Sequence, residues 1–463
     1  MSNILDLSAR TLTAHLRSGE LSSVELISAT YDRIEALNPT YNAIVSLRPR
    51  REVLAEAALA DGARASGATA ALHGLPIAVK DLSMTRGLRT TFGSPIFRDF
   101  VPETDSLMVA RLRAAGAIII GKTNTPEFGL GSHTYNPVFG PTRNALNPSL
   151  SAGGSSGGAA VAVATGMLPL ADGSDYGGSL RNPAAWNGIF GFRPSQGRVP
   201  TVPAADPFFG QLGTDGPMAR NVRDLALLLD VQAGYDPSAP LSLPDEAPIL
   251  PRLDIPAASR RYRIGWLGDL SGHLTFEPGI LEACEATLDR LSAQGCEVTH
   301  LAPDVDFEAL WQAFVILRQF NLSARLETLY RDPAKRALLK PEACWEVEGF
   351  LAQSGQDLLR ASMTRGAWYE KVAALFTQFD VLALPSAQVH PFAVEMHWTK
   401  SIAGYEMDSY HRWMEVVAPG TLSSCPVLNA PAGLSHGMPV GMQFIGKPRD
   451  DAGLLKFGLD HLE

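Results

Sequence analysis

Hydrophobic residues in the first part of the chain, residues 1–65, recur at the three- and four-residue spacing of a helix face. The clearest series follows Ser22 and Glu25, which have the spacing of a capping box. Its members are Val24, Ile27, Tyr31, Ile34 and Leu37. We therefore predict an N-terminal helical segment. This helix should end at Asn38, because a proline such as Pro39 disfavours the helical conformation in the residue before it.

From residue 72 onward, short apolar runs alternate with helical patterns. The runs at residues 75–79 and 117–120 have the length of buried strands, and Lys80 and Asp81 directly follow the first run. A helix is predicted between the two runs, from Thr104 or Asp105 to Ala115. Later strands are predicted at residues 263–266, 297–300 and 380–384, with a helix at residues 279–292. This alternation is typical of an α/β protein with a largely covered sheet.

The length of 463 residues suggests two or three domains at usual domain sizes. The best candidate for a boundary is the proline-rich segment 237–256. The same segment also suits a surface excursion within one domain, which we favour. We find no repeat and no low-complexity tract in the sequence.

Composition excludes several classes of partner. The net charge of −9 argues against a nucleic-acid surface, because phosphate binding relies on clustered Lys and Arg. Four widely spaced cysteines without a CxxC pair argue against a disulfide framework and suit the cytoplasm: Cys284, Cys296, Cys344 and Cys425. Asp6 and Arg10 stand where a signal peptide needs an apolar run, and no apolar stretch approaches the ~20 residues of a membrane span. We therefore predict a soluble, cytoplasmic protein with no nucleic-acid or membrane partner.

Glycine and serine are concentrated at residues 152–160 and 173–183. Glycine at this density usually marks tight turns or close approach of the backbone to a ligand. Residues 161–170 between the two stretches are apolar, which argues against a flexible surface loop. Each stretch contains a glycine-flanked serine, Ser155 and Ser179.

One competing interpretation of this region is the G-x-S-x-G nucleophile elbow, which residues 153–157 match. The elbow needs a strand directly before it, whereas residues 143–151 are turn-forming. It also needs a histidine base, for which His390, His397 and His411 are the candidates. We consider this interpretation the weaker one.

Residues 116–123 match the P-loop motif at every position, but residues 117–120 have the character of a buried strand. Asn124, Thr125 and Pro126 then stand where the P-loop helix should begin. We therefore expect Lys122 to be structural. No pair of histidines has the spacing of a metal site, and we predict neither a metal nor a cofactor.

Seven blocks of the sequence stand out by their order and spacing: residues 73–81, 121–129, 153–158, 173–181, 188–194, 425–433 and 437–443. Together they resemble the amidase signature family, over roughly residues 6–453. The resemblance implies an α/β fold, a single compact α/β/α unit in which helices surround a large mixed sheet. It further implies one domain over residues 1–463. Its parts are the helical segment 1–65, a core with the catalytic residues at 66–235, and a C-terminal part with substrate-selecting loops at 236–463.

The resemblance also implies Ser179 as nucleophile, Ser155 as bridging serine and Lys80 as base. The chemistry makes the same demands, because a serine hydroxyl is a weak nucleophile until a base removes its proton. Lysine is a base only when its amine is neutral. A neutral amine at pH 7 requires the lysine pKa to fall by ~3.4 units from its ordinary value, which corresponds to about 4–5 kcal/mol. Burial can lower the pKa of a lysine by this much. An ordinary salt bridge between Lys80 and Asp81 is the alternative. The family's bridging serine follows a cis peptide bond, here Gly154–Ser155.

The consecutive N–H groups of Tyr176, Gly177, Gly178 and Ser179 are the predicted oxyanion hole, because glycines let the chain turn these groups toward the developing charge. Asp175 and Arg181 flank this loop, and we interpret them as a structural pair.

For substrate binding, Gly129, Gly131 and Ser132 match a family segment that lines the site. An apolar pocket could be built from the aromatic residues Tyr135, Phe139, Trp186, Trp398, Tyr405, Tyr410 and Trp413, each of which also suits an ordinary core. We therefore predict a hydrolase of amides, anilides, carbamates or esters that takes a small apolar or aromatic substrate, and we leave a homodimer open. The alternatives are the A-type subunit of a tRNA-dependent amidotransferase and a non-catalytic scaffold that retains the fold.

Overall fold

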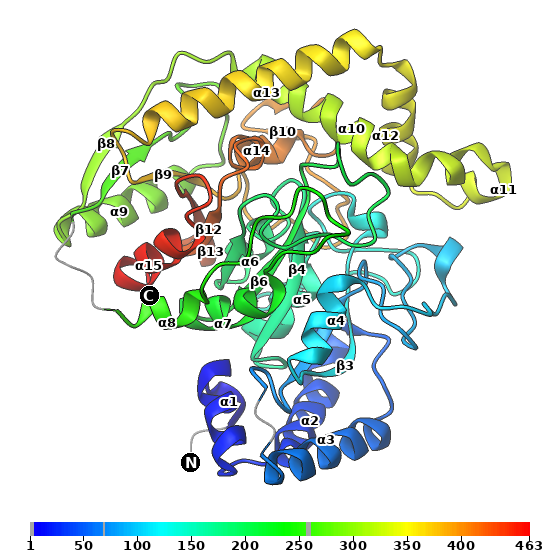
Figure 1. Ribbon diagram of the computed structural model, residues 1–463. Coiled ribbons are helices and arrows are strands. Elements are labelled where there is room, and N and C mark those ends of the chain that lie inside the picture. The colour runs from blue at the N-terminus through cyan, green and yellow to red at the C-terminus, as the bar shows by residue number, and fades with distance from the viewer. Residues whose placement is uncertain (1–3, 68–69, 256–260) are drawn as a thin grey trace.

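The computed structural model describes residues 4–67, 70–255 and 261–463. Its N-terminal helices α1 (Ala9–Ser18), α2 (Ser23–Tyr41) and α3 (Arg50–Ala65) lie together at one end of the molecule (Figure 1). The predicted capping box begins α2: the Ser22 side chain accepts from the Glu25 N–H at 3.1 Å, and the Glu25 carboxylate accepts from the Ser22 N–H at 2.9 Å.

The predicted end of α2 at Asn38 is wrong, because the helix continues through Pro39 to Tyr41. The reason lies in the hydrogen bonds of Asn38. The Asn38 carbonyl accepts from the N–H of Asn42 at 2.7 Å, and the Asn38 side-chain oxygen accepts from the N–H groups of Ala43 and Ile44. These bonds stabilise the last turn and hold the chain as it leaves the helix.

A small sheet carries the first predicted strands, in the order β1 (Ile44–Val45), β3 (Ile118–Thr123) and β2 (Pro76–Lys80). The parallel pairing of β2 with β3 sets Lys80 opposite Thr123. Helix α4 (Leu107–Ala114) precedes β3, close to its predicted bounds. Most of the residues that match the P-loop pattern, Ile118–Thr123, form the buried strand β3. The Lys122 ammonium donates to the Ser83 carbonyl and the Thr85 hydroxyl, in the structural role that we expected.

The large sheet has eight strands in the order β4-β6-β5-β12-β13-β9-β7-β8. Its pairs are antiparallel except for β7 with β8 and β7 with β9, so the sheet is mixed. Its strands are β4 (Leu170–Asp175), β5 (Phe190–Arg193), β6 (Thr214–Ala219), β7 (Arg263–Trp266), β8 (Glu297–His300), β9 (Val381–Pro385), β12 (Val427–Ser435) and β13 (Met438–Ile445). The prediction of a mixed α/β fold with one large sheet is confirmed, and β7, β8 and β9 lie at or within one residue of their predicted positions.

Helices surround this sheet (Figure 1). The helices in this part of the chain are α5 (Gly157–Ala164), α6 (Asn182–Trp186), α7 (Val222–Gln232), α8 (Ile249–Leu253), α9 (Ile280–Ala293), α10 (Phe307–Arg331), α11 (Pro333–Arg336), α12 (Pro341–Ala352), α13 (Gly355–Leu375), α14 (Ala418–Leu422) and α15 (Asp451–His461). Of these, α11 and α12 pack on α10, away from the large sheet. A short hairpin, β10 (Ser401–Ile402) with β11 (Tyr405–Glu406), stands apart from both sheets. The long helices α10 and α13 pack on each other over one side of the molecule, and α10 extends towards the site described below.

The proline-rich segment contains α8, whose Ile249 and Leu253 are buried in the same core as residues of β5 and α15. The far end of this segment, at Pro256, lies outside the described residues. None of the described helices is long and apolar enough to cross a membrane.

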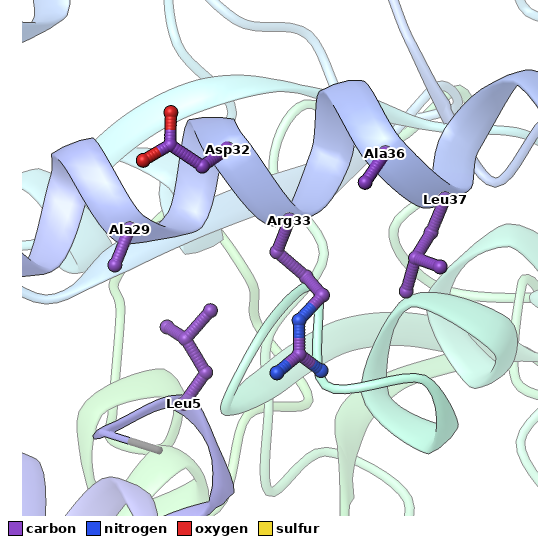
Figure 2. Close-up of a pocket in the computed structure, with 6 residues that line it drawn as sticks. All are labelled: Leu5, Ala29, Asp32, Arg33, Ala36 and Leu37. Carbon is purple, nitrogen blue, oxygen red and sulfur yellow. The ribbon is translucent and has the colours of Figure 1, made fainter.

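A groove of about 520 Å³ lies between Leu5 and α2 (Figure 2). The Arg33 side chain reaches from α2 across this groove and donates to the Thr165 carbonyl at 3.0 Å. The groove contains none of the predicted catalytic residues.

Candidate active site

Lys80 ends strand β2 and is fully buried. Its ammonium nitrogen lies 2.8 Å from the Ser155 hydroxyl, 2.8 Å from the Ser156 hydroxyl and 3.0 Å from that of Ser174. No carboxylate among the described residues forms a salt bridge with it. The alternative pairing with Asp81 is wrong, because the Asp81 carboxylate instead accepts from the N–H and hydroxyl of Thr91.

Burial lowers the pKa of Lys80 from 10.5 to about 7. The carboxylates of Asp172, Asp215 and Asp175 oppose this shift, with Asp172 the strongest. Asp172 also accepts from the backbone N–H of Lys80 at 3.1 Å, which links β2 to β4 of the large sheet. Burial likewise raises the pKa of Asp172 to about 7 and that of Asp215 to about 6. A neutral lysine amine is therefore accessible near pH 7.

Ser155 and Ser156 lie in the tight turn that precedes α5. The Gly154–Ser155 peptide bond is cis, as the family resemblance implied. The turn requires glycine, because Gly153 has a φ of +73° and a Cβ there would lie 2.6 Å from the Asn182 side-chain oxygen. The contacts of Ser156 and Ser174 with Lys80 were not predicted. The signal available in the sequence was their adjacency to Ser155 and to Asp175.

Ser179 lies in the loop that follows β4, and a buried ion pair holds this loop. Arg181 donates through two nitrogens to the Asp175 carboxylate, both at 3.0 Å. Arg181 also donates to the Val417 carbonyl and the Gln443 side chain, which fixes the loop to β13 and to the segment before α14. Asp175 and Arg181 thus form the structural pair that we expected.

The predicted oxyanion hole needs one correction. The N–H of Gly178 donates to the Asp175 carboxylate at 2.9 Å, because the buried carboxylate accepts hydrogen bonds from this loop. The N–H groups of Gly177 and Ser179 have no hydrogen-bond partner among the described residues. Gly178 has a φ of +94°, and a Cβ there would lie 3.0 Å from Val417, so glycine is required at this position.

Two cavities meet at this loop. Ser179 lines a narrow pocket of about 20 Å³, together with Gly129, Gly131 and Ser132, the three predicted binding residues. Ser155 lines a larger cavity of about 510 Å³. Gly129 lines both, and a Cβ on it would lie 3.5 Å from the Ser155 hydroxyl. The Ser179 hydroxyl forms no hydrogen bond with Ser155 or with any other described residue, and such bonds commonly form only once substrate is bound.

The aromatic walls of the Ser179 pocket are not the residues that we considered from the sequence. Trp186 and Trp413 stack on each other in the core with ring centroids 5.8 Å apart, and Tyr405 is 70% exposed. The walls instead come from Trp311 and Phe314 of α10. Nothing near them in sequence marks them, because hydrophobic residues at helical spacing are also the pattern of an ordinary core helix.

His411, one of the histidines considered as a base, also lines the Ser179 pocket. Its Nδ1 atom lies 3.1 Å from the Ser409 hydroxyl, and it forms no hydrogen bond with Ser179. Burial, with Arg318 and Arg412 nearby, lowers the pKa of His411 well below 6.5, so the imidazole is neutral at pH 7. This arrangement does not supply a Ser-His-Asp triad.

Arg318 of α10 lines both cavities, and Glu346 balances its charge. The Arg318 guanidinium donates to Glu346 at 2.6 Å and to the Tyr410 hydroxyl at 2.8 Å, and the Tyr410 hydroxyl also contacts Glu346. The positive charge of Arg318 in the wall of the site is therefore balanced by the negative charge of Glu346.

Comparison with known proteins identifies the family. The family described as Amidase matches residues 25–455. The chain belongs to the amidase signature family. Its curated relatives include the A-type subunit of the glutamyl-tRNA(Gln) amidotransferase of Chloroflexus aurantiacus, which is 34% identical over 99% of this chain and 96% of its own.

Solved structures of the family agree with this assignment. A bacterial aryl acylamidase superimposes with a TM-score of 0.91 at 28% identity, covering 97% of this chain and 94% of its own. The 6-aminohexanoate cyclic dimer hydrolase in complex with its substrate has a TM-score of 0.87 at 25% identity, covering 99% and 96%. The amidase signature chain described here is thus a hydrolase of the group that acts on carbon–nitrogen bonds.

Proposed function

We propose that this protein hydrolyses amide-type acyl bonds of small molecules through a serine acyl-enzyme. Ser179 is the nucleophile, Ser155 relays the proton and Lys80 is the base. The observation that carries the proposal is the buried Lys80 amine, 2.8 Å from the Ser155 hydroxyl and with a pKa lowered to about 7. Amides, anilides and carbamates, with esters as a further class, pass through the same tetrahedral intermediate.

The Ser179 oxygen bonds to the carbonyl carbon while its proton passes through the Ser155 hydroxyl to the neutral Lys80 amine. The N–H groups of Gly177 and Ser179, with that of Tyr176, bind the oxyanion. The carbon–nitrogen bond then breaks as the proton returns through Ser155 to the leaving nitrogen. Water attacks the acyl-enzyme by the same route and releases the acid.

The walls around Ser179 favour an uncharged acyl group over glutamine, whose α-amino and α-carboxylate groups are both charged. Trp311, Phe314 and Met414 are apolar, and Glu346 already neutralises Arg318. The TM-score of 0.91 with the aryl acylamidase supports a free-standing enzyme. The specific support for the second candidate, the A-type subunit of an amidotransferase, is the 34% identity with such a protein over 99% of the chain.

Steady-state kinetics test the proposal. Wild type and Ser179→Ala are compared on a panel of acyl anilides, primary amides, carbamates and glutamine. We expect turnover of an anilide or carbamate by wild type and its loss in Ser179→Ala. Release of ammonia from glutamine alone, with no anilide or carbamate cleaved, would select the amidotransferase function, and equal turnover by Ser179→Ala would refute the acyl-enzyme.

A further inference from the structure

The two cavities at the site differ in size by more than an order of magnitude. The narrow pocket has a volume of about 20 Å³. Ser179 lines it, together with residues that do not line the wide cavity: Gly131, Trp311, Phe314, Met414 and Val417. A single water molecule needs about 10–15 Å³ measured in this way. The wide cavity, lined by Ser155, Leu82, Phe128, Asp215 and Leu322 among others, has about 510 Å³, which is a usual size for a ligand site.

The proton relay determines which part of the substrate enters each cavity. In the tetrahedral intermediate, the former carbonyl carbon carries the Ser179 oxygen, the oxyanion, the leaving nitrogen and the acyl substituent. The leaving nitrogen must lie beside Ser155, since that hydroxyl delivers its proton. Ser155 lines the wide cavity and not the narrow one, so the amine side belongs in the wide cavity. The acyl substituent is then directed into the narrow pocket.

We propose that the substrate joins a short acyl group, of about acetyl size, to a bulky amine that occupies the wide cavity. This inference rests on the acyl-enzyme function proposed above. The walls of the narrow pocket are packed against other groups, which limits its widening. A Cβ on Gly177 would lie 2.9 Å from Phe314, and Trp311 packs on Phe314 with ring centroids 5.4 Å apart. Met414 and Val417 are almost fully buried.

The experiment measures kcat/KM for 4-nitroanilides with acetyl, butyryl and benzoyl groups, and for acetyl amides of ammonia, aniline and 2-naphthylamine. For wild type we expect a fall of about 100-fold or more from acetyl to benzoyl, and a rise from ammonia to naphthylamine. Met414→Ala should raise the benzoyl-to-acetyl ratio by about 10-fold and leave the amine ratios alone. Leu322→Trp should change the amine ratios and leave the acyl ratios alone. Met363→Ala, an exposed methionine on α13, is the matched control and should change neither.

The outcomes distinguish a wrong assignment of the cavities from a wrong acyl-enzyme function. If Ser179→Ala retains activity, the acyl-enzyme itself is wrong. If Ser179→Ala is inactive but wild type prefers benzoyl to acetyl, the assignment of the cavities is overturned. The same holds if Leu322→Trp rather than Met414→Ala changes the acyl ratios. The wild-type panel decides the point even where a variant does not fold.

A different observation concerns the polarity of the narrow pocket. The Ser409 hydroxyl donates its proton to Asp408 at 2.9 Å, so its oxygen must accept from His411, which places the His411 proton on Nδ1. The Nε2 atom is then an acceptor, and it has no hydrogen-bond partner among the described residues. The His411 ring lines the pocket and is held in place by stacking on Tyr410, with ring centroids 4.4 Å apart.

We infer that His411 Nε2 accepts a hydrogen bond from an O–H or N–H group on the acyl side of the substrate. Glycolyl and propionyl 4-nitroanilides test this, because their acyl groups are nearly equal in size and differ in that donor. For wild type, the ratio of kcat/KM for the glycolyl compound to that for the propionyl compound should exceed the ratio of their alkaline hydrolysis rates by about 10-fold. This excess corresponds to about 1.4 kcal/mol. His411→Phe should lose this excess preference, and Met414→Ala is the comparison variant in the same pocket. An excess that is absent in wild type, or that survives in His411→Phe, overturns the inference.

Discussion

The replacement Lys80→Met removes the proposed base while keeping an unbranched side chain in its place. An unperturbed lysine with a pKa of 10.5 would be neutral in about one molecule in 3,000 at pH 7. Burial lowers this pKa to about 7, a difference worth about 5 kcal/mol, so roughly half of the molecules carry a neutral amine at pH 7. We therefore expect kcat/KM of wild type to rise with pH up to about 7 and then level off. Lys80→Met should lose about 10²–10⁴-fold at the plateau, and its residual activity should lack this rise.

The assay is kcat/KM for an acyl anilide between pH 5.5 and 9.5 at constant ionic strength, which reports groups of the free enzyme. Lys122→Met is the matched control. Lys122 is a buried lysine on the neighbouring strand whose pKa burial lowers to about 8, but it contacts Ser83 and Thr85 instead of the serines of the site. Lys122→Met should keep the rise near pH 7.

The same variant has a second consequence that activity does not report. The folded-state pKa of Lys80 lies below the unfolded value, so the unfolded chain binds more protons between about pH 7 and 10.5. Stability of wild type relative to Lys80→Met should therefore grow as pH rises across this window, by up to about 5 kcal/mol. Urea unfolding at pH 7 and pH 10 measures the change. A rise in kcat/KM near pH 7 that persists in Lys80→Met, or a stability difference independent of pH, would refute a buried neutral lysine as the base.

Three further outcomes follow from the site. Asp215→Asn should move the rise in kcat/KM to lower pH, because the Asp215 carboxylate raises the pKa of Lys80; a shift to higher pH would contradict this. Arg181→Met should lower the free energy of unfolding by about 3–5 kcal/mol, since it leaves the buried Asp175 without its main partner. Arg360→Met, which breaks an exposed pair, should cost under about 1 kcal/mol in the same urea titration. A fluorophosphonate probe should label wild type and not Ser179→Ala by mass spectrometry, and labelling elsewhere would reject Ser179.

The elements with a strong local pattern could be predicted from the sequence. A short apolar run next to turn-forming residues places a strand within one or two residues, as at β2 and β7, and the end of β2 carries Lys80. The failure at Pro39 has a local cause as well. A proline in the last turn of a helix is tolerated where side-chain hydrogen bonds, here those of Asn38, stabilise the exit.

The pocket walls could not be predicted, because they depend on contacts between distant segments. Trp311 and Phe314 look like core positions of a helix in the sequence, and only the crossing of α10 over the Ser179 loop makes them walls of the site. His411 was noticed as a candidate base, but its proton position depends on Ser409 and Asp408 together. The Gly178 N–H was misassigned for the same kind of reason, since its acceptor is a side chain three residues away that the fold turns inward.

The hydroxyl groups around Lys80 explain how a buried lysine can both lose and regain a proton. A neutral amine has two N–H donors and one lone pair, whereas an ammonium has three donors. The hydroxyls of Ser155, Ser156 and Ser174 match both states, because each hydroxyl can donate or accept. The proton can therefore move without the heavy atoms rearranging. A carboxylate at 2.8 Å would instead hold the lysine protonated, and the acids that raise its pKa, Asp172 and Asp215, do not contact the amine. Because serines contact the amine and the carboxylates lie further away, the pKa of Lys80 stays near 7.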